Sequence, residues 1–282
     1  MAHMTVPEAE AILEKEFKVL NHGFVRLVDY LGSDARIVEA ARVSYGPGTK
    51  TAREDKGLID YLIRHRHTSP LEQVVFTFHV KMPIFVARQW VRHRTARMNE
   101  ISGRYSIMRD EFYVPDPQHV HYQSESNRQG RDENKAVPPE DIEKFIAKFE
   151  QINREAYGHY KGMLDDGISR ELARIALPLS LYTEFYWQMD LHNLMHFLNL
   201  RLEAHAQLEI RLYSQVIAKM VKAVTPYAWE AFEKRVLSSR SFSPEEIEAM
   251  RDLAEGREPG ADKRTMRTLR EKLGIKAQDP KK

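Results

Sequence analysis

The stretch Val74–Met82 constrains the fold more than any other part of the sequence. Its large apolar side chains fall on every second position, which is the period of a β-strand with one buried face. Pro83 follows at once, and proline suits the first position of a helix. We therefore expect a strand over 74–82 and then a helix that ends near Arg92.

A strongly basic stretch, residues 89–106, follows at the end of this predicted helix. Guanidinium groups match the geometry of phosphates and carboxylates, so several arginines in one short segment predict an anion-binding site. A solvated basic loop is the alternative interpretation. Glu100, Asn99 and Ser102 stand among the arginines, and this mixture favours a binding site because a solvated face needs no such variety.

Composition sets the broad class of the chain. Its 282 residues are 42% hydrophobic and 30% charged, which is typical of a soluble globular protein with a proper core. The formal net charge is only +2, so any basic patch must be local. The acidic first twenty residues do not look like a secretory signal, and no apolar run has the length of a membrane span. We expect a cytoplasmic protein.

Cysteine is absent from the sequence. Its absence excludes disulfides, thiolate nucleophiles and cysteine-ligated metals. The glycine-rich dinucleotide and Walker patterns are absent too, which argues against a Rossmann or P-loop nucleotide site. Any chemistry must therefore use other side chains or a cofactor.

The other periodic segments predict both strands and helices. Asp34 is expected to cap a short helix that follows it. Residues 116–139 are polar and predict a long surface loop. The helix predicted at 58–66 has Leu58, Tyr61 and Leu62 on its buried stripe. Strands or extended segments are expected at 23–31, 109–113 and 183–189. Further helices are expected at 140–165, 170–176, 191–202, 206–224, 245–254 (after a capping box at Ser243) and 263–273.

Two pairs of polar residues allow more than one interpretation. His192 and His196 are four apart on one helix face, a spacing that fits a metal pair, partly buried hydrogen-bonding groups, or donors to a flat heteroaromatic cofactor. Arg174 and Arg201 are embedded in apolar sequence. Each is either on the outer face of an amphipathic helix or buried and paired.

Several motifs resemble those of the flavin-dependent thymidylate synthases. The run Arg92–Ser106 resembles the R-H-R-x-x-S-x-N-x-x-S-x-R signature of that family. The resemblance covers residues 20 to 235, so the first twenty residues, the 116–139 loop and the tail after 240 fall outside it. Further matching segments are Phe76–Lys81, Phe85–Trp90, Ala173–Leu179, Tyr182–Thr183, Phe197–Arg201 and His205–Gln207.

The resemblance implies a fold, a reaction and an assembly. The fold is α+β, an antiparallel sheet packed with long helices, in a homotetramer whose active sites are shared between subunits. The reaction is reductive methylation of dUMP to dTMP, with methylenetetrahydrofolate as carbon donor and NADPH-reduced FAD as hydride source. The catalytic domain would span 1–240, followed by a charged helical extension, 241–282. The absence of cysteine fits, because folate-only thymidylate synthases attack uracil with a thiolate.

The matching positions carry the family's site residues onto this sequence. Arg201 is the implied catalytic residue, because a guanidinium near uracil N3 favours ionisation of the ring. Ser102 is chemically suited as a nucleophile, but no base is evident beside it, so we prefer a hydrogen-bonding role. The implied dUMP-binding residues are Gln89, Arg92, Glu100, Ile101, Ser102, Gly103, Arg104, Arg174 and Arg201. The implied FAD-binding residues are His67, Ser69, Arg92, His93, Arg94, Glu100, Asp190, Leu191, His192 and His196; no metal is expected.

Arg97 departs from the signature, which has serine at that position. It leaves three interpretations: pairing with Glu100, contact with a ligand phosphate, or exposure to solvent. A competing hypothesis for the whole chain is an RNA- or nucleotide-binding module that uses its arginines for phosphates. The basic residues are not spread over one face and most aromatics fall on core-facing positions, so the enzyme is favoured.

Overall fold

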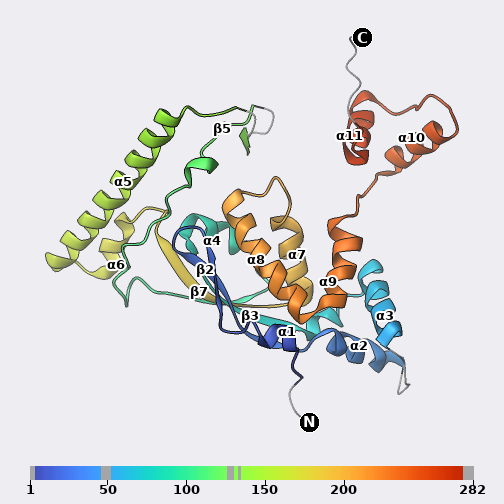
Figure 1. The fold of residues 1–282 in the computed structure, drawn as a ribbon, viewed down its shortest axis with the longest axis horizontal. Helices are drawn as coiled ribbons and strands as arrows, with labels where there is room; N and C mark the ends of the chain where they lie inside the picture. Colours follow the sequence, from blue (N-terminus) through green and yellow to red (C-terminus); the bar gives the residue numbers. More distant parts are fainter. Residues whose placement is uncertain (1–3, 46–51, 126–129, 133–134, 276–282) are drawn as a thin grey trace. The chain divides into compact units, whose positions relative to one another are not determined.

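The computed structural model describes residues 4–45, 52–125, 130–132 and 135–275 (Figure 1). It divides into two compact units, Met1–Phe232 and Glu233–Lys282, and each is described by itself. Among the described residues we find no helix with the length and hydropathy of a membrane span.

A five-stranded antiparallel sheet with the order β1-β2-β3-β7-β4 forms the centre of the first unit. β3 and β7 pair along their whole length, from Val75 opposite Asp190 to Pro83 opposite Tyr182. β4 lies at the edge and pairs with β7, so part of the basic stretch is a strand and not a loop. The strands are β1 (Glu16–Val19), β2 (Gly23–Leu31), β3 (Val75–Pro83), β7 (Tyr182–Asp190) and β4 (Arg97–Glu100).

Most of the other regular structure in the first unit is helical. The helices predicted at 140–165, 191–202 and 206–224 are present, with ends shifted by at most two residues. β1, α1 and α9 were not predicted. The helices are α1 (Pro7–Glu10), α2 (Asp34–Arg42), α3 (Ala52–Arg64), α4 (Ile84–Trp90), α5 (Pro139–Asp165), α6 (Arg170–Ala173), α7 (Leu191–Arg201), α8 (Leu208–Val224) and α9 (Pro226–Phe232), with 3-10 turns at Val43–Tyr45, Leu71–Gln73, Pro117–His119 and Arg174–Ala176.

An aromatic cluster holds α4, α7 and α8 against the sheet. Phe76 and Phe78 of β3 are fully buried, as the alternation predicts. The ring of Trp90, at the end of α4, lies 5.1 Å from that of Trp187 on β7 and 4.8 Å from that of Phe197 on α7. Burial of one such large apolar side chain contributes about 1.5–3 kcal/mol, so the end of α4 is firmly placed. In Figure 1, α7 and α8 pack side by side.

Asp34 caps α9 and not its own helix, contrary to the prediction. The N-cap of α2 is Ser33, while the Asp34 carboxylate accepts hydrogen bonds from the amides of Tyr227 (2.8 Å) and Ala228 (2.9 Å). Amides in the first turn of a helix lack intrahelical partners. A carboxylate that is only 8% exposed is therefore satisfied by a helix almost two hundred residues further along the chain.

The buried face of α3 also differs from the prediction. Ile59, Leu62 and Ile63 are buried, whereas Tyr61 is 42% exposed and its ring lies 4.3 Å from that of His65. The helix begins at Ala52, earlier than predicted, and packs against α9, which sets the face that is buried. Pro83 is likewise the last residue of β3 and the N-cap of α4, and not the first helical residue.

The 116–139 segment contains structure where a loop was predicted. It holds the 3-10 turn Pro117–His119 and a small sheet of β5 (Tyr122–Gln123) and β6 (Arg131–Asp132). The second unit contains a π-helix, Glu233–Leu237, and helices α10 (Pro244–Ala254) and α11 (Lys263–Leu273). The predicted capping box is present, because Glu246 and Ser243 exchange side-chain to backbone hydrogen bonds of 2.7 and 3.2 Å.

Candidate functional site

A cavity of about 290 Å³ lies where the chain leaves α4, along one side of α7 from Asn193 to Arg201. It brings together arginines and histidines that are up to 109 residues apart, from Arg92 to Arg201. The residues that line it are Arg92, His93, Arg94, Thr95, Met189, Asn193, His196, Leu200 and Arg201. Five of the predicted ligand-binding residues, Arg92, His93, Arg94, His196 and Arg201, therefore share one cavity.

The buried end of α4 positions the basic residues of this cavity. Trp90 is fully buried, and the backbone N–H of His93 donates to its carbonyl at 3.0 Å. The turn keeps His93 half-buried, while its neighbours Arg92 and Arg94 are exposed. The buried end of α4 thus presents two exposed cations and one half-buried imidazole to a ligand.

Arg201, the last residue of α7, is half-buried and paired. Its Nε donates to His93 Nε2 at 3.1 Å, and its Nη2 donates to the backbone carbonyl of Gln89 at 3.3 Å. Burial lowers the pKa of Arg201 from its ordinary value, but arginine remains charged near neutral pH. Of the two interpretations of this arginine, the paired one is correct.

His93 is held as a neutral imidazole. Burial lowers its pKa to about 4, helped by the positive charge of Arg201 and by His196. A guanidinium has only donors, so the His93 Nε2 that faces Arg201 must carry a lone pair. The proton of the neutral ring is therefore on Nδ1.

Gln89 lies next to this cavity, and its side chain is bonded to a residue that was not predicted to belong to the site. Its side-chain amide donates to the Oε1 of Gln207, which is the N-cap of α8. Gln207 stood in the sequence as part of the His205–Gln207 motif, so a signal was present. Its partner could not be read from the sequence because the two glutamines are 118 residues apart.

The remaining predicted dUMP-binding residues gather past the other end of β4. Glu100 accepts a 2.5 Å hydrogen bond from the Thr183 hydroxyl. Arg104 forms an ion pair with Glu171, with an N–O distance of 3.1 Å. A Cβ at Gly103 would lie 3.0 Å from Cδ of Arg174, so only glycine lets Arg174 lie across this backbone without a shift.

The predicted dUMP site is therefore in two parts within one chain. In space, Gln89, Arg92 and Arg201 lie near the residues that precede β4, whereas 100–104 and Arg174 lie at its other end and beyond. Arg174, unlike Arg201, is exposed, which matches the outer-face interpretation.

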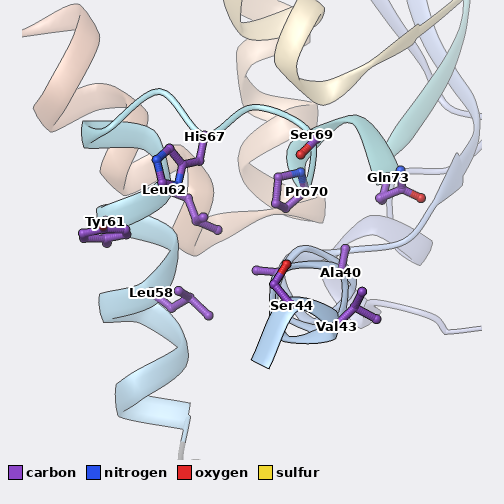
Figure 2. Close-up of a pocket in the computed structure, with 11 residues that line it drawn as sticks. Ala40, Val43, Ser44, Leu58, Tyr61, Leu62, His67, Ser69, Pro70 and Gln73 are labelled. Carbon is purple, nitrogen blue, oxygen red and sulfur yellow. The ribbon is translucent and has the colours of Figure 1, made fainter. Parts of the chain in front are cut away.

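A second, larger cavity of about 770 Å³ contains two of the predicted flavin residues, His67 and Ser69. Figure 2 shows it between α3, the end of α2 with the turn that follows it, and the chain at 67–73. Leu58 and Tyr61, predicted to be buried, line this cavity instead. The full lining is Ala40, Ala41, Val43, Ser44, Leu58, Tyr61, Leu62, His67, Ser69, Pro70 and Gln73.

The start of α7 lies against the chain that borders this second cavity. Asp190 caps α7 by accepting hydrogen bonds from the backbone and side-chain nitrogens of Asn193, at 2.9 and 2.8 Å. The N–H of Leu191 donates to the carbonyl of Val74 at 2.8 Å, and the Leu191 side chain is fully buried. Any ligand contact by Leu191 must therefore use its backbone. His192 follows in the first turn, one turn before His196.

Arg97 lies on β4 and faces β7. Its Nη1 donates to Oε1 of Gln188 at 3.4 Å, so neither pairing with Glu100 nor exposure alone describes it. As for a metal, the described residues contain no group of three or more histidine or acidic side chains placed to hold one.

An antiparallel sheet covered by helices, with a cation-lined cavity beside its edge strand, defines an α+β protein whose site suits an anionic ligand. The sequence profile of the family "Thymidylate synthase complementing protein" (Thy1) matches residues 26–227. The chain belongs to this family, the flavin-dependent thymidylate synthases.

Individual relatives agree with the profile. The flavin-dependent thymidylate synthase of Treponema denticola is 58% identical over 261 residues, which cover 93% of this chain and 98% of that protein. That of Thermus thermophilus is 57% identical over 235 residues, covering 83% and 84%. The structure of the UMP/dUMP methylase PolB from Streptomyces cacaoi, bound with 5-Br dUMP, has a TM-score of 0.71 at 32% identity and covers 79% of this chain and all of that one. The predicted family, α+β fold and enzyme class are confirmed.

Proposed function

We propose that this enzyme methylates dUMP to dTMP by the reductive route. Methylenetetrahydrofolate supplies the carbon, and FAD reduced by NADPH supplies the hydride. The observation that carries the proposal is the Arg201 guanidinium, held by His93 and by the Gln89 carbonyl at the wall of a cationic cavity. The names of the relatives, which are flavin-dependent thymidylate synthases and a UMP/dUMP methylase, support the choice of substrate and cofactor.

Arg201 has the charge that the first chemical step needs. Uracil becomes more nucleophilic at C5 when its ring is ionised at N3, and a fixed cation stabilises the developing negative charge. Because Arg201 is already oriented by two hydrogen bonds, little reorganisation is needed as that charge forms. The Gln89 carbonyl is bonded to Arg201 and Arg92 lines the same cavity as Arg201, so these two residues are suited to the uracil and the phosphate. We assign dUMP to these residues together with Glu100, Ile101, Ser102, Gly103, Arg104 and Arg174.

The residues fit a flavin dinucleotide, which is long, partly aromatic and carries a pyrophosphate. Arg92 and Arg94 supply exposed cations, while Ser69 and His67 line a cavity wide enough for an aromatic group. The start of α7 packs against the turn Leu71–Gln73, whose last residue lines the second cavity. The bound flavin would supply the hydride. We assign it to His67, Ser69, Arg92, His93, Arg94, Glu100, Asp190, Leu191, His192 and His196.

We further propose that the protein is a cytoplasmic homotetramer with shared active sites, and the two-part dUMP site supports the sharing. One chain holds its two groups of dUMP residues at opposite ends of β4, and in a shared site a second chain would bring a complementary group to each cavity. Apolar side chains beside Arg174 are unusually exposed: Leu172 by 61%, Ile175 by 74% and Leu179 by 61%. Such a patch is typical of a protein interface. We assign catalysis to residues 1–240 and treat 241–282 as an extension.

Spectroscopy and product analysis of the purified protein test the proposal. The protein should be yellow, should oxidise NADPH, and should form dTMP from dUMP only when methylenetetrahydrofolate is present. A colourless protein that takes up no FAD and releases no dTMP would overturn the proposal. Tight binding of RNA by that colourless protein would favour the nucleotide-binding module instead.

A further inference from the structure

We propose that His93 is a positioning residue for the reaction, which holds the Arg201 guanidinium toward the substrate through its Nε2 lone pair. This inference rests on the proposed function of Arg201 and adds to any contact that His93 makes with flavin. The observation behind it is the 3.1 Å hydrogen bond from Arg201 Nε to His93 Nε2.

The imidazole is itself placed by the protein core and not by a ligand. Its ring stands edge-on to the fully buried Phe197, with centroids 4.8 Å apart and an interplanar angle of 76°. Its backbone N–H is bonded to the carbonyl of Trp90, which is also fully buried. A restrained acceptor of this kind removes rotamers from the long arginine side chain and so reduces the entropy lost when substrate binds.

The charges around His93 keep that acceptor available. Arg201 and His196 face it from α7, and Arg92 and Arg94 flank it in the chain. Among the described residues that line the cavity none is acidic, so nothing there stabilises an imidazolium. A protonated ring would lose its lone pair and repel Arg201.

Loss of the imidazole leaves Arg201 with the longer, 3.3 Å bond to the Gln89 carbonyl. The guanidinium then samples other rotamers and spends less time in the orientation that faces the substrate. We expect His93→Ala to lower kcat by about 10- to 100-fold at saturating FAD and dUMP, because small misplacements of a catalytic group are that costly. His93→Gln carries a carbonyl oxygen that reaches the position of Nε2, so it should restore most of the lost kcat.

The chain offers a matched control in His79. Its Nδ1 makes a 2.8 Å hydrogen bond with Arg26 Nη2, and burial lowers its pKa too, but it lies on β3 away from the cavity. His79→Ala should leave kcat unchanged. A double-mutant cycle completes the kinetic test: in an Arg201→Lys background, His93→Ala should cause little further loss, because the two residues act as one unit.

A measurement without turnover separates this inference from the proposed function. In wild-type protein at neutral pH, nitrogen-15 NMR should show His93 Nε2 unprotonated, and the Arg201 Nε–H should lose its protection from hydrogen exchange in His93→Ala but keep it in His93→Gln. These spectra decide the geometry even if the wild type forms no dTMP. Equal kcat in the alanine and glutamine variants with melting temperatures like that of the wild type, or a protonated Nε2, would overturn the inference.

Discussion

Arg201 and Arg174 look alike in the sequence, and the fold separates them. Both stand in apolar surroundings within motifs of the family. Arg201 ends α7 with two hydrogen bonds to the α4 end of the basic stretch, whereas Arg174 is exposed and lies across Gly103. Their roles should differ accordingly, with Arg201 as the group that stabilises charge on the uracil ring.

We predict that Arg201→Ala keeps its flavin but loses turnover by about 10²- to 10³-fold, the effect of deleting one preorganised charge. The flavin absorbance of purified protein gives the first quantity, and steady-state dTMP formation gives the second. Unchanged turnover would remove Arg201 from the mechanism.

Among the described residues, Glu209 is the most deeply buried carboxylate with a cationic partner, and it binds Arg131 of the 116–139 segment. Its side chain is 2% exposed and pairs with Arg131 of β6, while Tyr113 donates to the same oxygen at 2.8 Å. Burial alone would raise the pKa of Glu209, but the Arg131 hydrogen bond and charge lower it. Its other oxygen is buried without a partner among the described residues.

We predict that Arg131→Ala destabilises the protein by about 3–5 kcal/mol, because it leaves a buried carboxylate without its counter-charge. The double variant with Glu209→Gln should recover part of this loss, since the buried charge is gone. Denaturant unfolding of both variants measures the effect. A loss of less than about 1 kcal/mol, the usual value for a surface pair, would show that the anchor is solvated.

At the scale of elements, Asp34 joins α2 to α9 across most of the sequence. Burial raises its pKa to about 6 although the amides of Tyr227 and Ala228 act in the opposite direction. The folded protein therefore binds a proton at this site more tightly than the unfolded chain, whose ordinary pKa is 3.8. Between pH 3.8 and 6 the contribution of this carboxyl to the free energy of unfolding falls as pH rises.

We predict that Asp34→Ala lowers stability by about 2–4 kcal/mol, because two amides at the start of α9 lose their acceptor. Asp34→Asn keeps one carbonyl acceptor and cannot ionise. The stability of the wild type relative to Asp34→Asn should therefore decrease from pH 4 to pH 6. Urea unfolding at several pH values checks this slope, and a difference that does not vary with pH would contradict the assigned burial.

At the scale of the whole molecule, the separation of the dUMP residues makes subunit sharing testable. If Arg201 from one subunit and Arg174 from another serve the same site, inactive Arg201→Ala and Arg174→Ala chains should regain activity when co-expressed in mixed oligomers. Some sites would then contain both native arginines. The matched control is Arg201→Ala mixed with Gln89→Ala, which should stay inactive because both residues come from the same chain. Recovery in neither mixture would contradict the sharing.

Regular patterns in the sequence predicted most of the sheet and the long helices. The alternation at 74–82 and 183–189 and the helical period at 140–165 follow from local burial, which a few neighbouring residues report. Short elements such as α9 and β4 carry too few residues to show a period. Their structure depends on partners elsewhere, since β4 is a strand only because β7 pairs with it.

By itself, therefore, the sequence determined the family, the α+β class and the identity of basic residues that line the smaller cavity. The tertiary structure decided which of those residues meet: Arg201 with His93, Gln89 with Gln207, and Arg174 with Gly103 at the far end of β4. These partners are 71 to 118 residues apart, from Gly103–Arg174 to Gln89–Gln207. Periodicity describes how a segment meets its immediate surroundings, but the packing of helices on the sheet sets which distant side chains come within hydrogen-bonding distance.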